Sequence, residues 1–324
     1  MRSIKLPSWI ERLAGLGPVS SPPHVFAVTP NELRYGAFHS GPQGFAFDLE
    51  KRVELPEETF ASGVLGGVIR DPKGFQEKLQ SLLDDIGAPI EGASLVLPDT
   101  WMRLALAEME DLPKRAAARQ EVLSWKLGHL VPFSVKDLRI SAIEVTPFPN
   151  QEEPRRILLG FAIDMLLNQL ESAFDEAGIQ LGNLTNNTLA ILAAVEEAVG
   201  PDDLAALVSV FDDSYTLSFF RSGEPLLYRY KGFADGGVFG DSVLRDLRMT
   251  DGFLQRQFPD IVLRRAFLAA PAELEEQWLG WLEGELDVIP EPLRFEHFDL
   301  SRGRAGVSWV QTAPLLGAAR IEVY

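Results

Sequence analysis

The stretch LVSVFDDSYTLSFFRSGEPLLYRY, residues 207–230, decides the fold. Hydrophobic and polar residues alternate along it as in two strands joined by a turn, and Ser222-Gly223 forms a second turn within it. The first turn is Phe211-Asp212-Asp213-Ser214, at a place where glycines are expected if the turn binds phosphate. The residues of this turn therefore bear on whether the chain is an ATPase or a scaffold.

A weak counterpart of this hairpin lies near the N-terminus. Strands are predicted over residues 24–28 and 33–38, joined at Pro30-Asn31, and a third begins at Phe45. Ser40-Gly41 follows them at the place that Ser222-Gly223 takes 182 residues later. Helices follow each copy, so this duplication predicts a two-lobed α/β fold.

Periodicity predicts the other elements. Helices are predicted over residues 74–86, 113–130, 166–177, 184–199 and 312–319. Strands are predicted over residues 93–97, 138–145 and 156–163, and residues 263–288 follow the pattern strand, loop, helix, strand.

The composition excludes several classes of function. The 324 residues carry a formal net charge of −17, which repels nucleic acid and anionic lipid unless a local basic patch is present. The richest basic group, Lys114-Arg115 with Arg119, lies on a predicted helix, and no long basic run occurs. The absence of cysteine excludes disulfides and thiolate chemistry, and no signal peptide or membrane span is expected. We expect a cytosolic protein attached to a membrane-bound partner.

The first 14 residues form a short amphipathic arm. Trp9, Ile10 and Leu13 fall on one helical face, and a linker rich in Gly, Pro and Ser follows over residues 15–23. Two interpretations stay open. The arm packs on the body as an N-terminal turn, or it docks on a partner or a membrane surface.

Several segments together resemble the PilM family, the actin-like cytoplasmic proteins of type IV pilus assembly. They are also similar to the cytoplasmic domain of GspL proteins of type II secretion. The match extends over nearly the whole chain from about residue 24. The segments are residues 95–100 (LVLPDT), 121–138 with LVPFSVKD, 157–178, the hairpin at 207–230 and 313–320 (APLLGAAR).

The resemblance implies a two-lobed actin-like fold, the duplicated ribonuclease H-like architecture, with an inserted α+β subdomain in the first lobe. The implied segments are an arm and linker (1–23), the first lobe (24–92), the inserted subdomain (93–180) and the second lobe with its return to the first (181–324). The implied function is that of a cytoplasmic scaffold in type IV pilus or type II secretion-like machinery.

In ATP-binding members of this fold two Asp-x-Gly turns hold the phosphates, because glycine lets backbone N–H groups approach the oxygens. Here Ala27 and Thr29 replace the acid and the glycine of the first turn, and Ser209 and Phe211 replace those of the second. The glycine-rich adenosine loop corresponds to residues 268–272 around Ala270, which contain no glycine. The sequence therefore predicts a non-enzyme without nucleotide, cofactor or metal ion.

Two alternatives remain beside the scaffold. One is a divergent ATPase that binds ATP and magnesium through Asp212, Asp213, Gly236 and Gly237. The other is a membrane-tethered filament protein whose Trp9 and Ile10 enter the lipid interface. The histidines at 24, 39, 129 and 297 show no metal-ligand spacing.

The resemblance also implies a partner. This is the cytoplasmic N-terminal peptide of a PilN-like bitopic inner-membrane protein, bound in a groove between the first lobe and the inserted subdomain. Trp125, Leu130, Val131 and Phe133 are the candidate groove residues, and the equal alternative places all four in the core.

The arm itself resembles the partner's peptide through Ile4 and Leu6, within Ser3-Ile4-Lys5-Leu6-Pro7. Docking of this arm in its own groove or a neighbour's would give autoinhibition or self-association. The protein is expected to be cytoplasmic and peripheral to the inner membrane through its partner, with no nucleic acid bound.

Overall fold

The computed structural model describes residues 23–41, 44–61, 67–109, 112–145, 155–199, 204–221, 224–233, 240–260, 262–294, 300–302 and 309–321. The chain divides into two compact units. The first unit holds Met1–Ala194, Asp299–Val307 and Gln311–Tyr324. The second holds Val195–Phe298 and Ser308–Val310.

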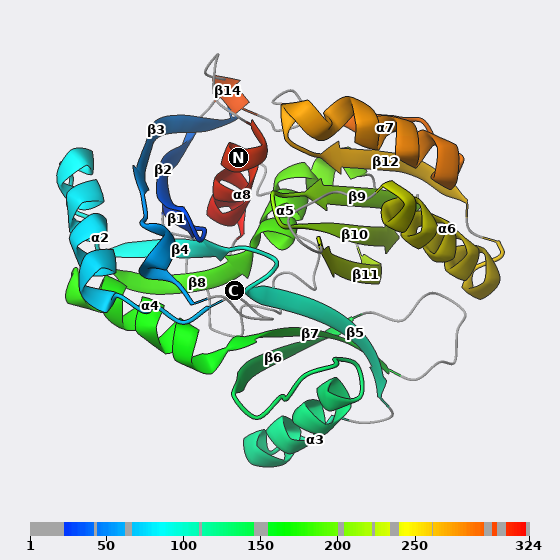
Figure 1. The fold of residues 1–324 in the computed structure, drawn as a ribbon, viewed down its shortest axis with the longest axis horizontal. Coiled ribbons are helices and arrows are strands. Elements are labelled where there is room, and N and C mark those ends of the chain that lie inside the picture. The colour runs from blue at the N-terminus through cyan, green and yellow to red at the C-terminus, as the bar shows by residue number, and fades with distance from the viewer. Residues whose placement is uncertain are drawn as a thin grey trace. The chain divides into compact units, whose positions relative to one another are not determined.

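A six-stranded sheet forms the centre of the first unit, in the order β14-β3-β2-β1-β4-β8 (Figure 1). Its strands are β1 (His24–Val28), β2 (Glu32–Gly41), β3 (Gly44–Glu54), β4 (Gly92–Leu97), β8 (Gln180–Asn186) and β14 (Leu300–Arg302). The pairs β1–β2 and β2–β3 are antiparallel, whereas β1–β4 and β4–β8 are parallel. A short 3-10 helix, η1 (Glu57–Thr59), follows β3.

Helices cover both faces of this sheet. On one face α2 (Pro72–Ile86) and α4 (Asp164–Glu176) bury an apolar stripe against β1, β2 and β4, with Phe26, Phe75 and Phe174 fully buried among them (Figure 1). On the other face α8 (Trp309–Arg320) packs against β2, and α5 (Asn187–Val199) packs on α8. Burial of these stripes is the main force that holds the layers together.

A small subdomain is inserted between β4 and α4. We define it as residues 102–163, with β5 (Met102–Met109), α3 (Ala116–Gly128), β6 (Leu138–Val145) and β7 (Arg155–Ile163). Its sheet is antiparallel in the order β5-β7-β6. One face of α3 is buried against this sheet through Leu123 and Leu127, which gives the subdomain an apolar core of its own.

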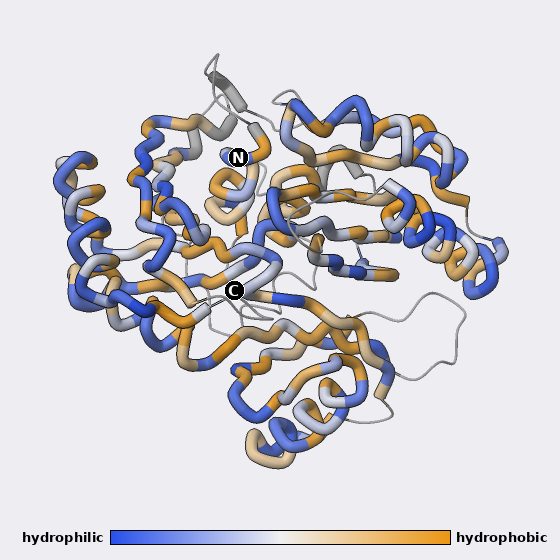
Figure 2. Tube along the Cα trace, viewed as in Figure 1, coloured by the Kyte–Doolittle hydropathy of each residue, from blue (hydrophilic) through white to orange (hydrophobic). Residues whose placement is uncertain are grey.

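The second unit contains a five-stranded sheet in the order β11-β10-β9-β12-β13. Its strands are β9 (Leu204–Val210), β10 (Ser214–Arg221), β11 (Glu224–Gly232), β12 (Leu263–Ala269) and β13 (Pro290–Pro292). Hydrophilic and hydrophobic residues alternate along the helices α6 (Gly240–Gln257) and α7 (Ala272–Leu286), whereas β9 and β12 are mainly hydrophobic (Figure 2).

The two large sheets repeat one topology. In each, three antiparallel strands in sequence are followed by a parallel strand next to the first of them, as β3-β2-β1-β4 and β11-β10-β9-β12 show. The predicted duplication and the two-lobed α/β class are therefore confirmed. The boundaries predicted for the four chain segments stay predictions; β4, placed in the inserted segment by them, pairs with β1 and β8 in the large sheet.

One predicted element is wrong in part. Residues 184–186 were assigned to a helix with 187–199, but they form the end of β8, which pairs in parallel with β4. Sheet pairing with a buried neighbour overrides the helical pattern that the apolar run creates with α5. Strand β5 was not predicted, since its mixed sequence MRLALAEM follows neither period clearly.

Candidate functional site

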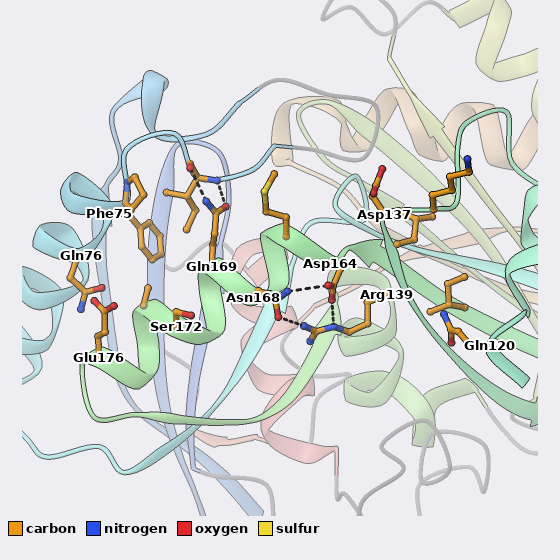
Figure 3. A pocket seen from close by; sticks show the side chains of 17 residues that line it. Phe75, Gln76, Gln120, Asp137, Arg139, Asp164, Asn168, Gln169, Ser172 and Glu176 are labelled. Carbon is orange, nitrogen blue, oxygen red and sulfur yellow. Dashed lines mark hydrogen bonds and ion pairs between the residues drawn. The ribbon is translucent and has the colours of Figure 1, made fainter. Parts of the chain in front are cut away.

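A groove of about 770 Å³ lies within the first unit, where the small subdomain meets α2 and α4 (Figure 3). This volume lies in the range of roughly 300–1,000 Å³ that is usual for ligand sites. Its lining residues are Ile69, Pro72, Phe75, Gln76, Gln120, Lys136, Asp137, Leu138, Arg139, Ile140, Asp164, Met165, Asn168, Gln169, Ser172, Ala173 and Glu176.

The groove combines apolar surface with side-chain amides. Phe75, Leu138 and Ile140 are buried in its floor, whereas the Met165 side chain is exposed, at 55 %. An exposed thioether is flexible and adapts its shape to apolar partners. Gln76 and Gln120 line the same groove, and their side chains form no hydrogen bond to another residue within the described part of the chain. This combination suits an extended peptide, which needs pockets for side chains and polar partners for its backbone.

Arg139, at the start of β6, ties the small subdomain to α4 along one wall. Its Nε donates to Asp164 Oδ1 at 2.7 Å and its Nη2 to Asn168 Oδ1 at 2.7 Å (Figure 3). Its Nη1 donates to Glu171 Oε1 at 2.6 Å. The hydrogen bond to Glu171, followed by that to Asp164, raises the pKa of Arg139 above its ordinary value. The guanidinium is therefore committed to holding this wall and is not available to a ligand.

On the opposite wall, the side-chain amide of Gln169 pairs with the backbone of Ile69 as a neighbouring strand would. Its Oε1 accepts from Ile69 N at 2.8 Å and its Nε2 donates to Ile69 O at 3.1 Å, so one side chain satisfies both backbone groups of Ile69 (Figure 3). Both walls of the groove are thus anchored on α4, and the site is preformed.

The four residues predicted to contact a peptide do not line this groove, and their contact with a peptide stays a prediction. None of Trp125, Leu130, Val131 and Phe133 is among its lining residues. Trp125 and Leu130 are exposed, whereas Val131 and Phe133 are half-buried beside the core of the small subdomain. The sequence did not predict the lining of this groove, because its residues come from four separate segments, none of which forms a motif.

The turn after β1, which was compared with the first phosphate-binding turn, is held by its own hydrogen bonds. Thr29, just after β1, donates its N–H to Glu32 O at 2.9 Å. Its Oγ1 accepts from Glu32 N at 3.1 Å and from Asn31 N at 3.4 Å. Ala27 is buried, and Pro30 has no N–H to offer. The donors that a phosphate would require therefore already have acceptors within the turn.

The second turn joins β9 to β10 in the second unit. Phe211 N donates to Ser214 O at 2.9 Å, and Ser214 Oγ donates to Asp213 Oδ1 at 2.7 Å. Asp212 and Asp213 are exposed, Phe211 is half-buried and the Ser209 side chain is fully buried. Two carboxylates at this turn make an anion unfavourable there.

The other predicted nucleotide residues are placed as follows. Ala270 is buried directly after β12, where Pro271 precedes the first turn of α7. Gly240 begins α6, and a Cβ atom there would lie 3.1 Å from Trp281 Cζ2, so this glycine serves packing. Gly236 and Gly237 lie outside the described residues, as do Ile4, Leu6, Trp9 and Ile10 of the arm.

A buried carboxylate occupies the N-terminus of α5. Asp99 accepts from Thr188 N at 3.2 Å and from the Thr188 hydroxyl, and it is 1 % exposed. A helix N-terminus is a ready anion site, and here the protein supplies the anion itself. Over the described residues no group of three or more His, Cys, Asp or Glu side chains could hold a metal ion, and no helix is long and apolar enough to cross a membrane.

Comparison with solved structures identifies the fold. A chain of the PilM-PilN type IV pilus biogenesis complex superposes with a TM-score of 0.72 at 16 % identity, over 94 % of this chain and 99 % of that one. A Bacteroides thetaiotaomicron protein with an actin-like ATPase fold and unknown function gives 0.51 at 9 % identity, over 86 % and 93 %. The cytoplasmic domain of EpsL, an inner membrane component of the type II secretion system of Vibrio cholerae, gives 0.47 at 12 %, over 91 % and 93 %.

The sequence matches no protein-family model and no curated protein. The fold rests on the first two of these structures. The chain has an actin-like fold, and the predicted resemblance to PilM is confirmed at the level of the fold.

Proposed function

We propose that this protein is a scaffold of type IV pilus or type II secretion-like machinery that binds the N-terminal peptide of a PilN-like membrane protein. The observation that carries the proposal is the likeness to a chain of the PilM-PilN complex over nearly the full length of both chains. The preformed groove between α2, α4 and the small subdomain supports a peptide as the ligand. Through this partner the protein is held at the cytoplasmic face of the inner membrane.

Peptide binding is tested by changing the groove at two exposed positions. We expect Met165→Glu and Ser172→Arg each to weaken binding of the labelled N-terminal peptide of the PilN-like protein at least tenfold, measured by fluorescence anisotropy. Glutamate removes an apolar contact and arginine fills the space above α4. Met249→Glu, at an equally exposed methionine on α6, is the matched control and should bind as the wild type does. If both groove variants bind the peptide as tightly as the wild type does, the peptide does not bind in this groove.

We further propose that the scaffold works without nucleotide and is not an enzyme. Three observations support this. The turn at Thr29 satisfies its own hydrogen-bond donors, Asp212 and Asp213 place two carboxylates at the second turn, and the carboxylate of Asp99 occupies the N-terminus of α5. We expect the melting temperature of the protein to be the same with saturating ATP and magnesium as with magnesium alone. A nucleotide at 100 times its Kd would instead stabilise the protein by about 2.7 kcal/mol. A rise in melting temperature that Asp212→Ala and Asp213→Ala abolish would favour the divergent ATPase.

A further inference from the structure

Basic residues are concentrated in and around α3. Residues 112–136 contain five of the 30 lysines and arginines of the chain but only one of its 47 acidic residues, Glu121. The basic residues are Lys114, Arg115, Arg119, Lys126 and Lys136. The remainder of the chain is strongly acidic, and Asp111 and Asp137 border this segment directly, so the excess of positive charge is confined to residues 112–136.

These cations form no ion pairs within the described residues. All are exposed except the half-buried Lys126, and none of them pairs with a carboxylate within the part of the chain that the structure describes. Arg119 makes one internal contact, in which its Nε donates to Pro113 O at 3.2 Å. Charges without internal partners remain free to interact with an external anion.

Two large apolar side chains stand beside the cations. Trp125 is 66 % exposed and Leu130 is 45 % exposed, and the Trp125 ring meets the edge of His129 at 4.6 Å between centroids. Because a helix turns about 100° per residue, Trp125 points away from Leu123 and Leu127, which bury the opposite face of α3. Trp125 therefore lies outside the buried core of the small subdomain.

We propose that this face of α3 binds the surface of an anionic phospholipid membrane. Trp125 and Leu130 would enter the interface between head groups and acyl chains, where tryptophan is favoured, and Arg115, Arg119 and Lys126 would contact lipid phosphates. A stable protein interface instead buries about 800 Å² per partner around a packed centre. Trp125 on α3 and Leu130 just after this helix offer much less apolar area, whereas a bilayer adapts to them.

The patch also adjoins the groove. Gln120 of α3 and Lys136, both within residues 112–136, line the groove as well. If the proposed function is correct, membrane binding through α3 would bring the groove to the bilayer surface, where the peptide of a membrane protein emerges. Only this link rests on the proposed function, and lipid binding itself is tested without any peptide.

The test is cosedimentation of the full chain with vesicles of phosphatidylglycerol and phosphatidylcholine, compared with vesicles of phosphatidylcholine alone. We expect binding to the anionic vesicles only, and its loss in high salt, which screens the lipid phosphates. The double variant Trp125→Ala/Leu130→Ala and the triple variant Arg115→Glu/Arg119→Glu/Lys126→Glu should each reduce the partition coefficient at least tenfold.

Matched variants of α6 and of the arm serve as controls. Arg245→Glu/Arg256→Glu/Phe253→Ala alters exposed positions of α6 and should bind vesicles as the wild type does. Circular dichroism and an unchanged melting temperature would show that the α3 variants are folded. Absence of wild-type binding to anionic vesicles overturns the proposal. So does binding that the α3 variants retain but Trp9→Ala/Ile10→Ala removes, or a Trp125-dependent self-association without lipid binding.

Discussion

Replacing Gly317 with alanine is expected to destabilise the protein by about 3 kcal/mol or more, which is the upper part of the range for overpacked cores. A Cβ atom at Gly317 would lie 1.6 Å from Ala190 O and 2.4 Å from Ala190 C. Both are backbone atoms of α5, which cannot turn aside as a flexible side chain would. The helices α8 and α5 would have to separate, and α8 is buried along nearly its whole length, as Leu315, Leu316 and Ala318 show.

The measurement is chemical denaturation of the wild type and the variant, followed by far-UV circular dichroism. Gly284→Ala in α7 is a matched control, because nothing lies within 4 Å of the position that its Cβ would take. There the same substitution should stabilise the protein by about 0.4–1 kcal/mol, through the lower entropy of the unfolded chain. A loss smaller than ~1 kcal/mol for Gly317→Ala would mean that the two helices are not packed as closely as described.

Asp99→Ala should be the other strongly destabilising substitution, at about 2–4 kcal/mol. The carboxylate is the acceptor for the N–H and the hydroxyl of Thr188, and all of these groups are buried. Leaving a buried donor without an acceptor costs about 1–3 kcal/mol, and loss of the charge at the helix N-terminus adds to this. Asp99→Asn keeps one acceptor oxygen and should lose less.

A double-mutant cycle separates this effect from a general defect. Thr188→Val removes the hydroxyl at nearly constant shape, so Asp99→Ala/Thr188→Val should be less destabilised than the sum of the single variants. Asp71→Ala provides an exposed comparison, since Asp71 Oδ1 accepts from Gly74 N at 3.0 Å at the start of α2. There we expect a loss of only about 1 kcal/mol, typical of an exposed helix cap. Simple additivity in the Asp99 cycle would contradict the proposed coupling.

Much of the fold could be predicted because most elements carry a clear period. Alternation in residues 24–38 and 207–230 gave two hairpins, and their similarity gave the repeated sheet order. The stripe of Phe75, Leu79 and Leu82 gave α2, and Gly87, with φ at 68°, marks its end. Periodicity gave the wrong prediction for residues 184–186 of β8, because a short buried strand that runs directly into a helix has the apolar pattern of one longer helix.

The candidate site was less accessible to sequence analysis. Trp125 and Leu130 were predicted to line the groove that the resemblance implies, because a peptide in such a groove binds partly through apolar anchors. Whether they line the groove depends on the rotation of α3, which the packing of Leu123 and Leu127 sets. The groove residues Gln76, Asn168 and Ser172 carry no signal in isolation.

The sequence by itself predicted the repeated hairpin and the two-lobed α/β class, because hydrophobic periodicity is a local property of the chain. The resemblance to the PilM family added the actin-like architecture, which the solved structures confirm. Only the tertiary structure decided which side chains meet. The groove joins segments around residues 72, 120, 138 and 168, the exposed face of α3 depends on what its other face buries, and the small size of Gly317 matters only because α5 crosses there. Such contacts depend on packing between distant segments, which no local pattern records.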